Sequence, residues 1–215
     1  MNRTVLVFAP HPDDEILGCG GVIAKRKKQG FRVIVCVATS DGNSEREREE
    51  NESASLLGVD EVVRLGLPDM ELDRIDHKKL TGMVLGVIEK YRPEEVYSPY
   101  RFDLHNDHRA LAEAVLVAIR PKYPFSPKRV LSYETLSETG WNFQDGDNFF
   151  KPNVYEDISG EIDAKVRALE IHESQIMDYP SPRSSDGVRA LSMHRGVESE
   201  TMFAEAFCLV REYLR

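Results

Sequence analysis

Long hydrophobic runs are absent from this sequence of 215 residues. No stretch approaches the roughly 20 apolar residues that a membrane-spanning helix needs. The N-terminus also lacks the layout of a signal peptide, because it leads directly into the short apolar run at residues 4–9. These two absences disfavour a membrane as partner and predict a cytoplasmic location.

Cysteine and basic surface are scarce as well. The three cysteines cannot all pair; Cys36 and Cys208 lie in apolar runs and Cys19 lies in a glycine-rich helical stretch, so we interpret them as reduced structural thiols. The formal net charge is -9, and the only basic cluster, residues 25–28, is typical of a solvated helix face. This charge distribution disfavours a nucleic acid as partner.

What is present is an alternation of short apolar runs with helical patterns. Strands are predicted at residues 4–9, 31–38, 61–67, 94–99 and 129–134, and helices at about 13–29, 45–57, 76–91 and 107–119. The alternation predicts an α/β fold: a Rossmann-like, doubly wound, mostly parallel sheet in three α/β/α layers. After residue 121 the pattern is less regular, with a helix expected at 161–175 and a closing strand or helix at 203–211.

Two clusters of histidine and carboxylate residues carry the chemistry. Pro10-His11-Pro12-Asp13-Asp14-Glu15 follows the first predicted strand and opens the first helix. His105-Asn106-Asp107-His108 lies between the fourth strand and the fourth helix. The carboxyl ends of parallel strands share one edge of the sheet, where open α/β proteins bind their ligands. We therefore expect the two clusters to meet in space.

Together the clusters supply the donors of a hydrolytic zinc site, which uses three protein ligands and leaves one position for water. Adjacent Asp13 and Asp14 cannot easily both point at one ion. One of them is therefore expected to bind the metal while the other acts on the water as general base. His105 and His108 allow the same division, with one as ligand and one facing the substrate carbonyl.

Each cluster also has a plainer interpretation. An ordinary helix start explains the acids of the first cluster, because acidic side chains suit a helix N-terminus, but it does not explain His11. His105 and His108 can be two loop histidines with Asp107 as the helix cap. The presence of both clusters on one predicted edge favours a metal site.

The motif Pro-His-Pro-Asp-Asp-Glu after the first strand, with a later His-x-Asp-His, resembles the PIG-L, or LmbE-like, N-deacetylase family. The resemblance covers nearly the whole chain, through residues 39–42, Arg46-x-x-Glu49, 57–59, 65–69, Arg195-Gly196 and 204–207. It implies a single LmbE-like domain over residues 1–215. Residues 1–120 would form the Rossmann-like core with both metal motifs, and residues 121–215 would complete the substrate pocket.

The resemblance implies one Zn²⁺ per chain, bound by His11, Asp14 and His108. It further implies that Asp13 is the general base, that His105 stabilises the oxyanion, and that Asp107 orients or tunes a neighbouring imidazole. The implied reaction hydrolyses the acetamide of an N-acetylated amino sugar of the N-acetylglucosamine type and releases acetate and a free amine. A site with two histidines and one carboxylate also accepts Fe²⁺, Co²⁺ or Mn²⁺.

Four further residues are expected near the substrate. The resemblance suggests that Arg46 and Asp69 contact sugar hydroxyls or a substrate anion, and Ser40 and Asp41 follow the second strand at the same edge. Each has a rival interpretation. Arg46 belongs to a charged stretch typical of a solvated helix face, and the other three are common turn residues.

Two other functions stay open. One is an amidase that removes a larger acyl group from an amino-sugar conjugate, and the other is a sugar or nucleotide binding module without catalysis. The intact set of ligands, base and second histidine disfavours the binding module. The frequent assembly of the family into rings makes a homo-oligomer an expectation.

Overall fold

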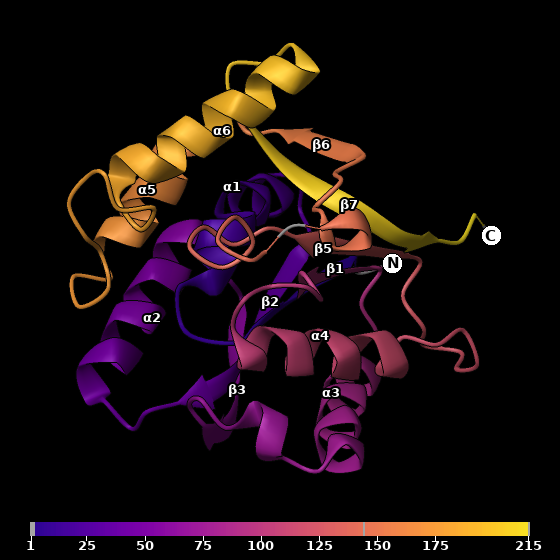
Figure 1. Cartoon of the computed structure of the whole chain (residues 1–215). Helices are drawn as coiled ribbons and strands as arrows, with labels where there is room; N and C mark the ends of the chain where they lie inside the picture. The colour runs from indigo at the N-terminus through magenta and orange to yellow at the C-terminus, as the bar shows by residue number, and fades with distance from the viewer. Residues whose placement is uncertain (1–2, 144, 215) are drawn as a thin grey trace.

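The computed structural model describes residues 3–143 and 145–214, and within them seven strands form one sheet (Figure 1). The order across the sheet is β3-β2-β1-β4-β5-β7-β6; β1 to β5 are parallel, and β7 is antiparallel to both of its neighbours. The strands are β1 Thr4–Ala9, β2 Arg32–Ser40, β3 Glu61–Pro68, β4 Glu95–Pro99, β5 Arg129–Tyr133, β6 Val154–Asp157 and β7 Ala204–Glu212. This sheet confirms the predicted fold class.

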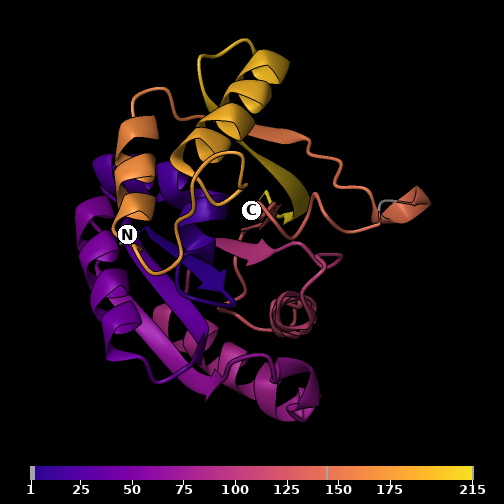
Figure 2. The same cartoon turned by 60° about the vertical axis from the view of Figure 1, so that its left-hand side comes forward.

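Helices cover both faces of the sheet, as the two views in Figures 1 and 2 show. Helices α3 and α4 pack on one face, α1, α2 and α5 cover the other, and α6 packs against α5 and β7. The helices are α1 Asp14–Lys28, α2 Ser44–Leu57, α3 His77–Tyr91, α4 Asn106–Ala118, α5 Ile162–Glu170 and α6 Ser185–Ser199, with short 3₁₀ turns η1 Leu72–Arg74 and η2 Gly146–Asn148. No helix in the described ranges has the length and apolar character to cross a membrane.

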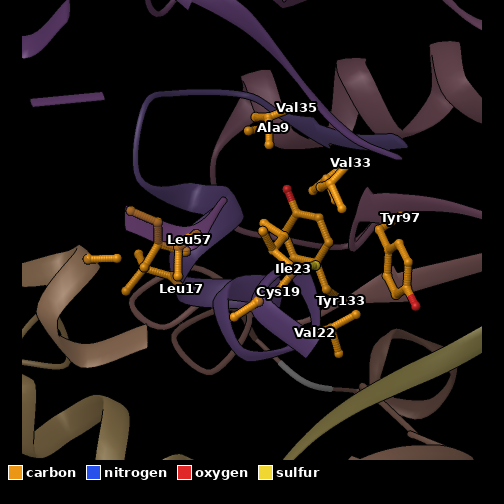
Figure 3. Packing of buried hydrophobic residues seen from close by; sticks show 14 of the residues in the cluster. Ala9, Leu17, Cys19, Val22, Ile23, Val33, Val35, Leu57, Tyr97 and Tyr133 are labelled. Atoms are coloured by element: carbon orange, nitrogen blue, oxygen red, sulfur yellow. The ribbon is translucent and has the colours of Figure 1, made fainter. Parts of the chain in front are cut away.

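Alternation along the strands builds a hydrophobic core on each face. In β1, Val5, Val7 and Ala9 belong to the cluster beneath α1, whereas Leu6 and Phe8 belong to the cluster beneath α3 and α4. Figure 3 shows the first cluster from close by, with Ala9 and its neighbours on the strands facing side chains of α1. Burial on both faces explains the near-continuous apolar runs by which the central strands were predicted.

The irregular second half departs from the sequence predictions. The helix expected at residues 161–175 ends at Glu170, and the closing element at 203–211 is the strand β7. The predictions missed β6 and α6. Helix α6 buries only Val188, Ser192 and Gly196, so its apolar periodicity is too weak to predict a helix.

A buried ion pair joins α1, α5 and β7. The carboxylate of Glu205 accepts hydrogen bonds from the backbone N–H groups of Gly21 (2.8 Å) and Val22 (2.7 Å) and from Nζ of Lys165 (2.6 Å). Lys165 Nζ also donates to the carbonyl oxygen of Leu17 at 2.9 Å. Both charged side chains therefore bind the middle of α1, whose N-terminus carries the first histidine motif.

Hydrogen bonds of the buried residues Glu49 and Ser53 fasten the segment after α5 to α2. The carboxylate of Glu49 accepts from the backbone N–H (3.2 Å) and from Oγ (2.7 Å) of Ser174. Nε2 of His172 lies 3.0 Å from Oγ of Ser53, and Nδ1 of His172 is buried without a hydrogen-bond partner among the described residues. Burial lowers the pKa of His172 to about 4, so the ring is neutral in the folded protein at neutral pH.

The neutral ring of His172 predicts a loss of stability in acid. The unfolded chain binds a proton at His172 below about pH 6.5, whereas the folded protein does so only near pH 4. Above about pH 6.5 the ring is neutral in both states, and the free energy of unfolding keeps its full value. As the pH falls from about 6.5 to about 4, the free energy of unfolding decreases by about 3 kcal/mol. Urea unfolding near neutral pH and near pH 4 should show a smaller pH dependence for His172→Asn than for the unmodified protein. An equal pH dependence in the two proteins would contradict this account.

Candidate metal centre

The two histidine motifs meet at the carboxyl edge of the sheet. His11 and Asp14 lie between β1 and the first turn of α1, and His108 lies in the first turn of α4. Oδ2 of Asp14 is 3.1 Å from Nδ1 of His11 and 3.2 Å from Nε2 of His108. The ligand atoms of these three side chains all lie within 4.8 Å of one another, a spacing that one ion can bridge.

The charges of these three groups also fit a cation. Burial raises the pKa of Asp14, but the charge and hydrogen bonds of His108 and His11 outweigh it and hold this pKa well below its usual range. Burial lowers the pKa of His108, but Asp14 and Asp103 outweigh it and raise this pKa to about 9. The raised pKa means that His108 holds a proton near neutral pH in the absence of metal. A divalent cation displaces this proton when it binds, because metal ligands must be deprotonated. The residues present therefore fit a metal ion.

A further carboxylate, that of Asp103, orients His108 by contacting the ring nitrogen that faces away from Asp14. Nδ1 of His108 lies 2.9 Å from Oδ2 of the buried Asp103, and Oδ1 of Asp103 accepts a hydrogen bond from Thr139 Oγ1 at 2.5 Å. A carboxylate on the second nitrogen fixes the tautomer of a ligand imidazole and raises its basicity. Asp103 and Thr139 thus hold Nε2 of His108 toward Asp14.

Asp103→Asn should weaken metal binding by about 10- to 100-fold, because the amide keeps the volume of the side chain but loses the charge that makes His108 a better ligand. Competition with a chelator of known affinity measures this change. The matched control is Asp73→Asn, since Asp73 is exposed and its carboxylate accepts a hydrogen bond from the exposed Asn106 at 3.1 Å. An unchanged affinity in Asp103→Asn would show that Asp103 does not support the ligand.

A second group of ligand-type atoms comprises His11, His105 and Asp107. The carboxylate of this group already accepts two hydrogen bonds. Oδ2 of Asp107 accepts one from the backbone N–H of Met70 and Oδ1 accepts one from the backbone N–H of Leu72, each at 2.9 Å. Oδ2 of Asp107 also lies 3.2 Å from Nε2 of His11. These bonds favour the group His11, Asp14 and His108 as the metal site. They also show that the imidazole that Asp107 contacts is that of His11.

His105 is the N-cap of α4, so the interpretation of Asp107 as the cap is wrong. Nδ1 of His105 accepts the backbone N–H of Asp107 at 3.1 Å, and a neutral ring then carries its proton on Nε2. Burial lowers the pKa of His105, and the charges of His11 and His108 lower it further, which favours this neutral form. The Nε2–H group is the kind of donor that stabilises a developing oxyanion.

Asp13 has an unusual conformation for a non-glycine residue. It is fully buried and precedes α1 with φ of 101°, in the left-handed region that costs most side chains free energy. Its backbone N–H donates to Oε2 of Glu15 at 3.1 Å, which supports this turn. Arg183 donates to Oδ2 of Asp13, and Oδ1 is buried with no hydrogen-bond partner in the described part of the chain. Burial raises the pKa of Asp13 to about 6, against the opposing charge of Arg183.

The four expected substrate contacts lie at this edge with different partners. Oδ1 of Asp69 is 3.1 Å from Nε2 of His11, so Asp69 belongs to the surroundings of the metal site. Arg46 donates to Asp41 at 2.8 Å, and Ser40 Oγ accepts the backbone N–H of Gly42 at 3.1 Å, as in an ordinary turn. Nε of Arg46 is buried without a hydrogen-bond partner in residues 3–143 and 145–214. These four residues stay predicted substrate contacts.

Sequence reasoning missed three residues that contact the site: Asp103, Thr139 and Arg183. Asp103 precedes His105 in the pattern Asp-x-His-x-Asp-His, so its place beside the second motif was a usable signal. Thr139 and Arg183 lie in the irregular second half and belong to no motif. Their contacts depend on the paths of long connections, which local sequence does not predict.

Comparison with known proteins agrees with the fold and with the family that the motifs resemble. The family model of PIG-L, GlcNAc-PI de-N-acetylase, matches residues 6–119, which include both histidine motifs. The chain therefore belongs to the PIG-L family, as the sequence motifs predicted. Members of this family are de-N-acetylases, so the prediction of a hydrolytic deacetylase is confirmed at the level of the family.

Two relatives and one solved structure extend this comparison. The diacetylchitobiose deacetylase of Thermococcus kodakarensis is 29% identical, with 97% of this chain and 83% of the relative covered. The probable N-acetyl-alpha-D-glucosaminyl L-malate deacetylase 2 of Bacillus cereus is 27% identical, with 81% and 84% covered. The crystal structure of the conserved protein TT1542 from Thermus thermophilus superposes with a TM-score of 0.80 and 28% identity over 98% of this chain and 96% of that one.

Proposed function

We propose that the protein hydrolyses the acetamide of an N-acetylated amino sugar of the N-acetylglucosamine type with one bound Zn²⁺. The observation that carries the proposal is the grouping of His11, Asp14 and His108 beside the strained, buried carboxylate of Asp13. One of the relatives named above is a diacetylchitobiose deacetylase and the other is a probable N-acetyl-alpha-D-glucosaminyl L-malate deacetylase, which supports this substrate class. The donor set of two imidazoles and one carboxylate suits zinc.

In this proposal His11, Asp14 and His108 hold the zinc ion, with Asp103 and Asp107 behind the two imidazoles. When bound, zinc would lower the pKa of a water molecule and polarise the acetyl carbonyl group. Asp13 is the general base, because its buried Oδ1 has no partner among the described residues and lies one residue from the ligand Asp14. A strained backbone that places one side chain is typical of a functional site.

The chemical steps follow from these roles. Asp13 takes a proton from the attacking water as the water oxygen bonds to the acetyl carbon. His105 donates its Nε2–H hydrogen bond to the carbonyl oxygen, which becomes the oxyanion. The C–N bond then breaks, and the proton held by Asp13 passes to the leaving nitrogen. The products are a free amine and acetic acid, which loses its remaining proton to become acetate at neutral pH.

The remaining parts of the proposal concern the substrate and the assembly. Arg46, Asp69, Ser40 and Asp41 are proposed to contact the sugar at the rim of the site. Residues 121–215 are proposed to complete the pocket, supported by the contacts of Thr139 and Arg183 with Asp103 and Asp13. A homo-oligomer and a cytoplasmic location stay predictions.

A panel of amides tests the function directly. The zinc-loaded protein is incubated with N-acetylglucosamine, N,N'-diacetylchitobiose and an N-acetylglucosaminyl malate, each beside an analogue with a longer acyl chain, and the released amine is measured. Greater amine release from the acetyl compounds than from their longer-chain analogues supports the proposal. Release only from the longer acyl compounds would establish an amidase instead, and parallel loading with Fe²⁺, Co²⁺ and Mn²⁺ tests the choice of metal.

A further inference from the structure

Arg183 contacts the proposed general base although 170 residues separate the two in the sequence. Its guanidinium group donates from Nη2 to Oδ2 of Asp13, and its side chain is mostly buried. The second oxygen of Asp13, Oδ1, is buried and has no hydrogen-bond partner among the described residues. The two oxygens of one carboxylate therefore differ, because one is held and the other is free to accept a proton.

The local sequence holds the backbone of Arg183 in a closed turn. Its carbonyl oxygen accepts the N–H of Met177 at 3.0 Å, and its own N–H donates to Oγ of Ser181 at 3.3 Å. Ser184, the N-cap of α6, donates from Oγ to the carbonyl oxygen of Ser181 at 2.6 Å and accepts the N–H of Gly187 at 3.0 Å. These four bonds fix the point from which the Arg183 side chain extends.

The same segment is anchored to the helices on this face of the sheet. Ser174 bonds Glu49 and His172 lies against Ser53, so the connection between α5 and α6 is attached to α2. Helix α2 in turn contacts α1, which begins directly after Asp13. The connection that leads to Arg183 is thus attached to α2 near its start, while residues 177–180 within it are exposed.

We propose that Arg183 is a positioning residue for catalysis, which holds Oδ2 of Asp13 so that Oδ1 is the atom that takes the proton from the attacking water. The inference rests on the proposed deacetylase function. The proton leaves the water as the water oxygen bonds to the acetyl carbon, resides on Oδ1, and passes to the nitrogen as the C–N bond breaks. Arg183 keeps its own protons throughout. Misplacing a reacting group by about 1 Å can cost roughly 100-fold in rate.

The test compares Arg183→Ala and Arg183→Lys with the unmodified protein in the amine-release assay. We expect the alanine variant to lose about 100-fold in kcat with KM within about threefold, because the base is misplaced while the sugar contacts remain. The lysine variant should recover part of the loss, since it restores one charged donor. Added guanidinium at millimolar concentration should raise kcat of the alanine variant and leave the unmodified protein unchanged.

Arg189→Ala is the matched control, because Arg189 pairs with Asp163 on the surface at 2.7 Å. It should keep the normal kcat. Bound zinc, measured by elemental analysis, should be equal in all variants. Arg183→Ala should lower the thermal unfolding midpoint, because it leaves the buried Asp13 carboxylate without its charged partner, so kcat is compared at a temperature well below that midpoint. A normal kcat in Arg183→Ala, a rise in KM alone, or a loss of zinc that accounts for the lost activity would overturn the inference. If the unmodified protein releases amine from none of the amides, the proposed function is overturned and the inference with it.

Discussion

Asp13→Asn should retain its metal and lose turnover by about 1000-fold, since a positioned general base contributes about 100- to 10,000-fold. The amide has the volume of the carboxylate and keeps an oxygen that can accept from Arg183, so the fold and the metal ligands should remain. It cannot accept the proton of the attacking water at Oδ1, where the carboxylate is buried and unpartnered within the described ranges. The measurement is kcat in the amine-release assay beside the zinc content of the same sample.

The control for Asp13→Asn is Asp163→Asn, which removes a carboxylate from the exposed surface of α5. The control variant should match the unmodified protein in turnover, in zinc content and in thermal unfolding midpoint. Near-normal turnover in Asp13→Asn with zinc bound would remove Asp13 from the role of base. The proton would then have to pass to another group, and the buried Glu15 is the nearest further acid in the motif.

The fold of the first half was predictable because its signals are local. Apolar runs buried on both faces predicted the central strands, and each is followed by a helical pattern with its own end signal. The meeting of the two histidine motifs followed from topology alone, because β1 and β4 are adjacent and parallel and their loops open on one edge. Neither step needed knowledge of a side-chain contact.

The surroundings of the proposed metal ligands were not predictable in the same way. Whether His105 or Asp107 caps α4 depends on the residue at which the helix begins. A small shift of that start changes which of the two side chains caps the helix and which can make other contacts. With His105 as the cap, the Asp107 carboxylate can hold the backbone at Met70 and Leu72 and contact His11. This arrangement assigns the two motif residues different tasks, which their spacing in the sequence left open.

The contacts made by the second half depend on long connections. Arg183 reaches Asp13 only because the segment between α5 and α6 is fastened to α2, and α6 itself has too weak an apolar pattern to be predicted. Burial and the partner charge at Asp13 are tertiary properties, as is the lack of a partner for Oδ1 among the described residues. The motif therefore supplies the proposed base, while the rest of the fold determines how its carboxylate is held.

Lys165→Met should lower the free energy of unfolding by about 3–5 kcal/mol, the usual cost of leaving a buried charge without its partner. Lys165 and Glu205 are each only 3% exposed in their side chains, so water cannot replace the lost partner of Glu205. The Glu205 carboxylate would remain in contact with the backbone of α1 at Gly21 and Val22 without its compensating charge. Urea unfolding at neutral pH measures the loss.

The double variant Lys165→Met with Glu205→Gln separates the charge from the packing. Removing both charges should recover about 2 kcal/mol of the loss, because a neutral amide in a buried site needs no counter-charge and can still accept one backbone N–H. If the double variant is less stable than Lys165→Met, the carboxylate has its effect through the two N–H groups of α1 and not through the ion pair. If Lys165→Met unfolds within about 1 kcal/mol of the unmodified protein, the pair does not fasten α1 to the closing strand, and the position of the first histidine motif must depend on the hydrophobic core alone.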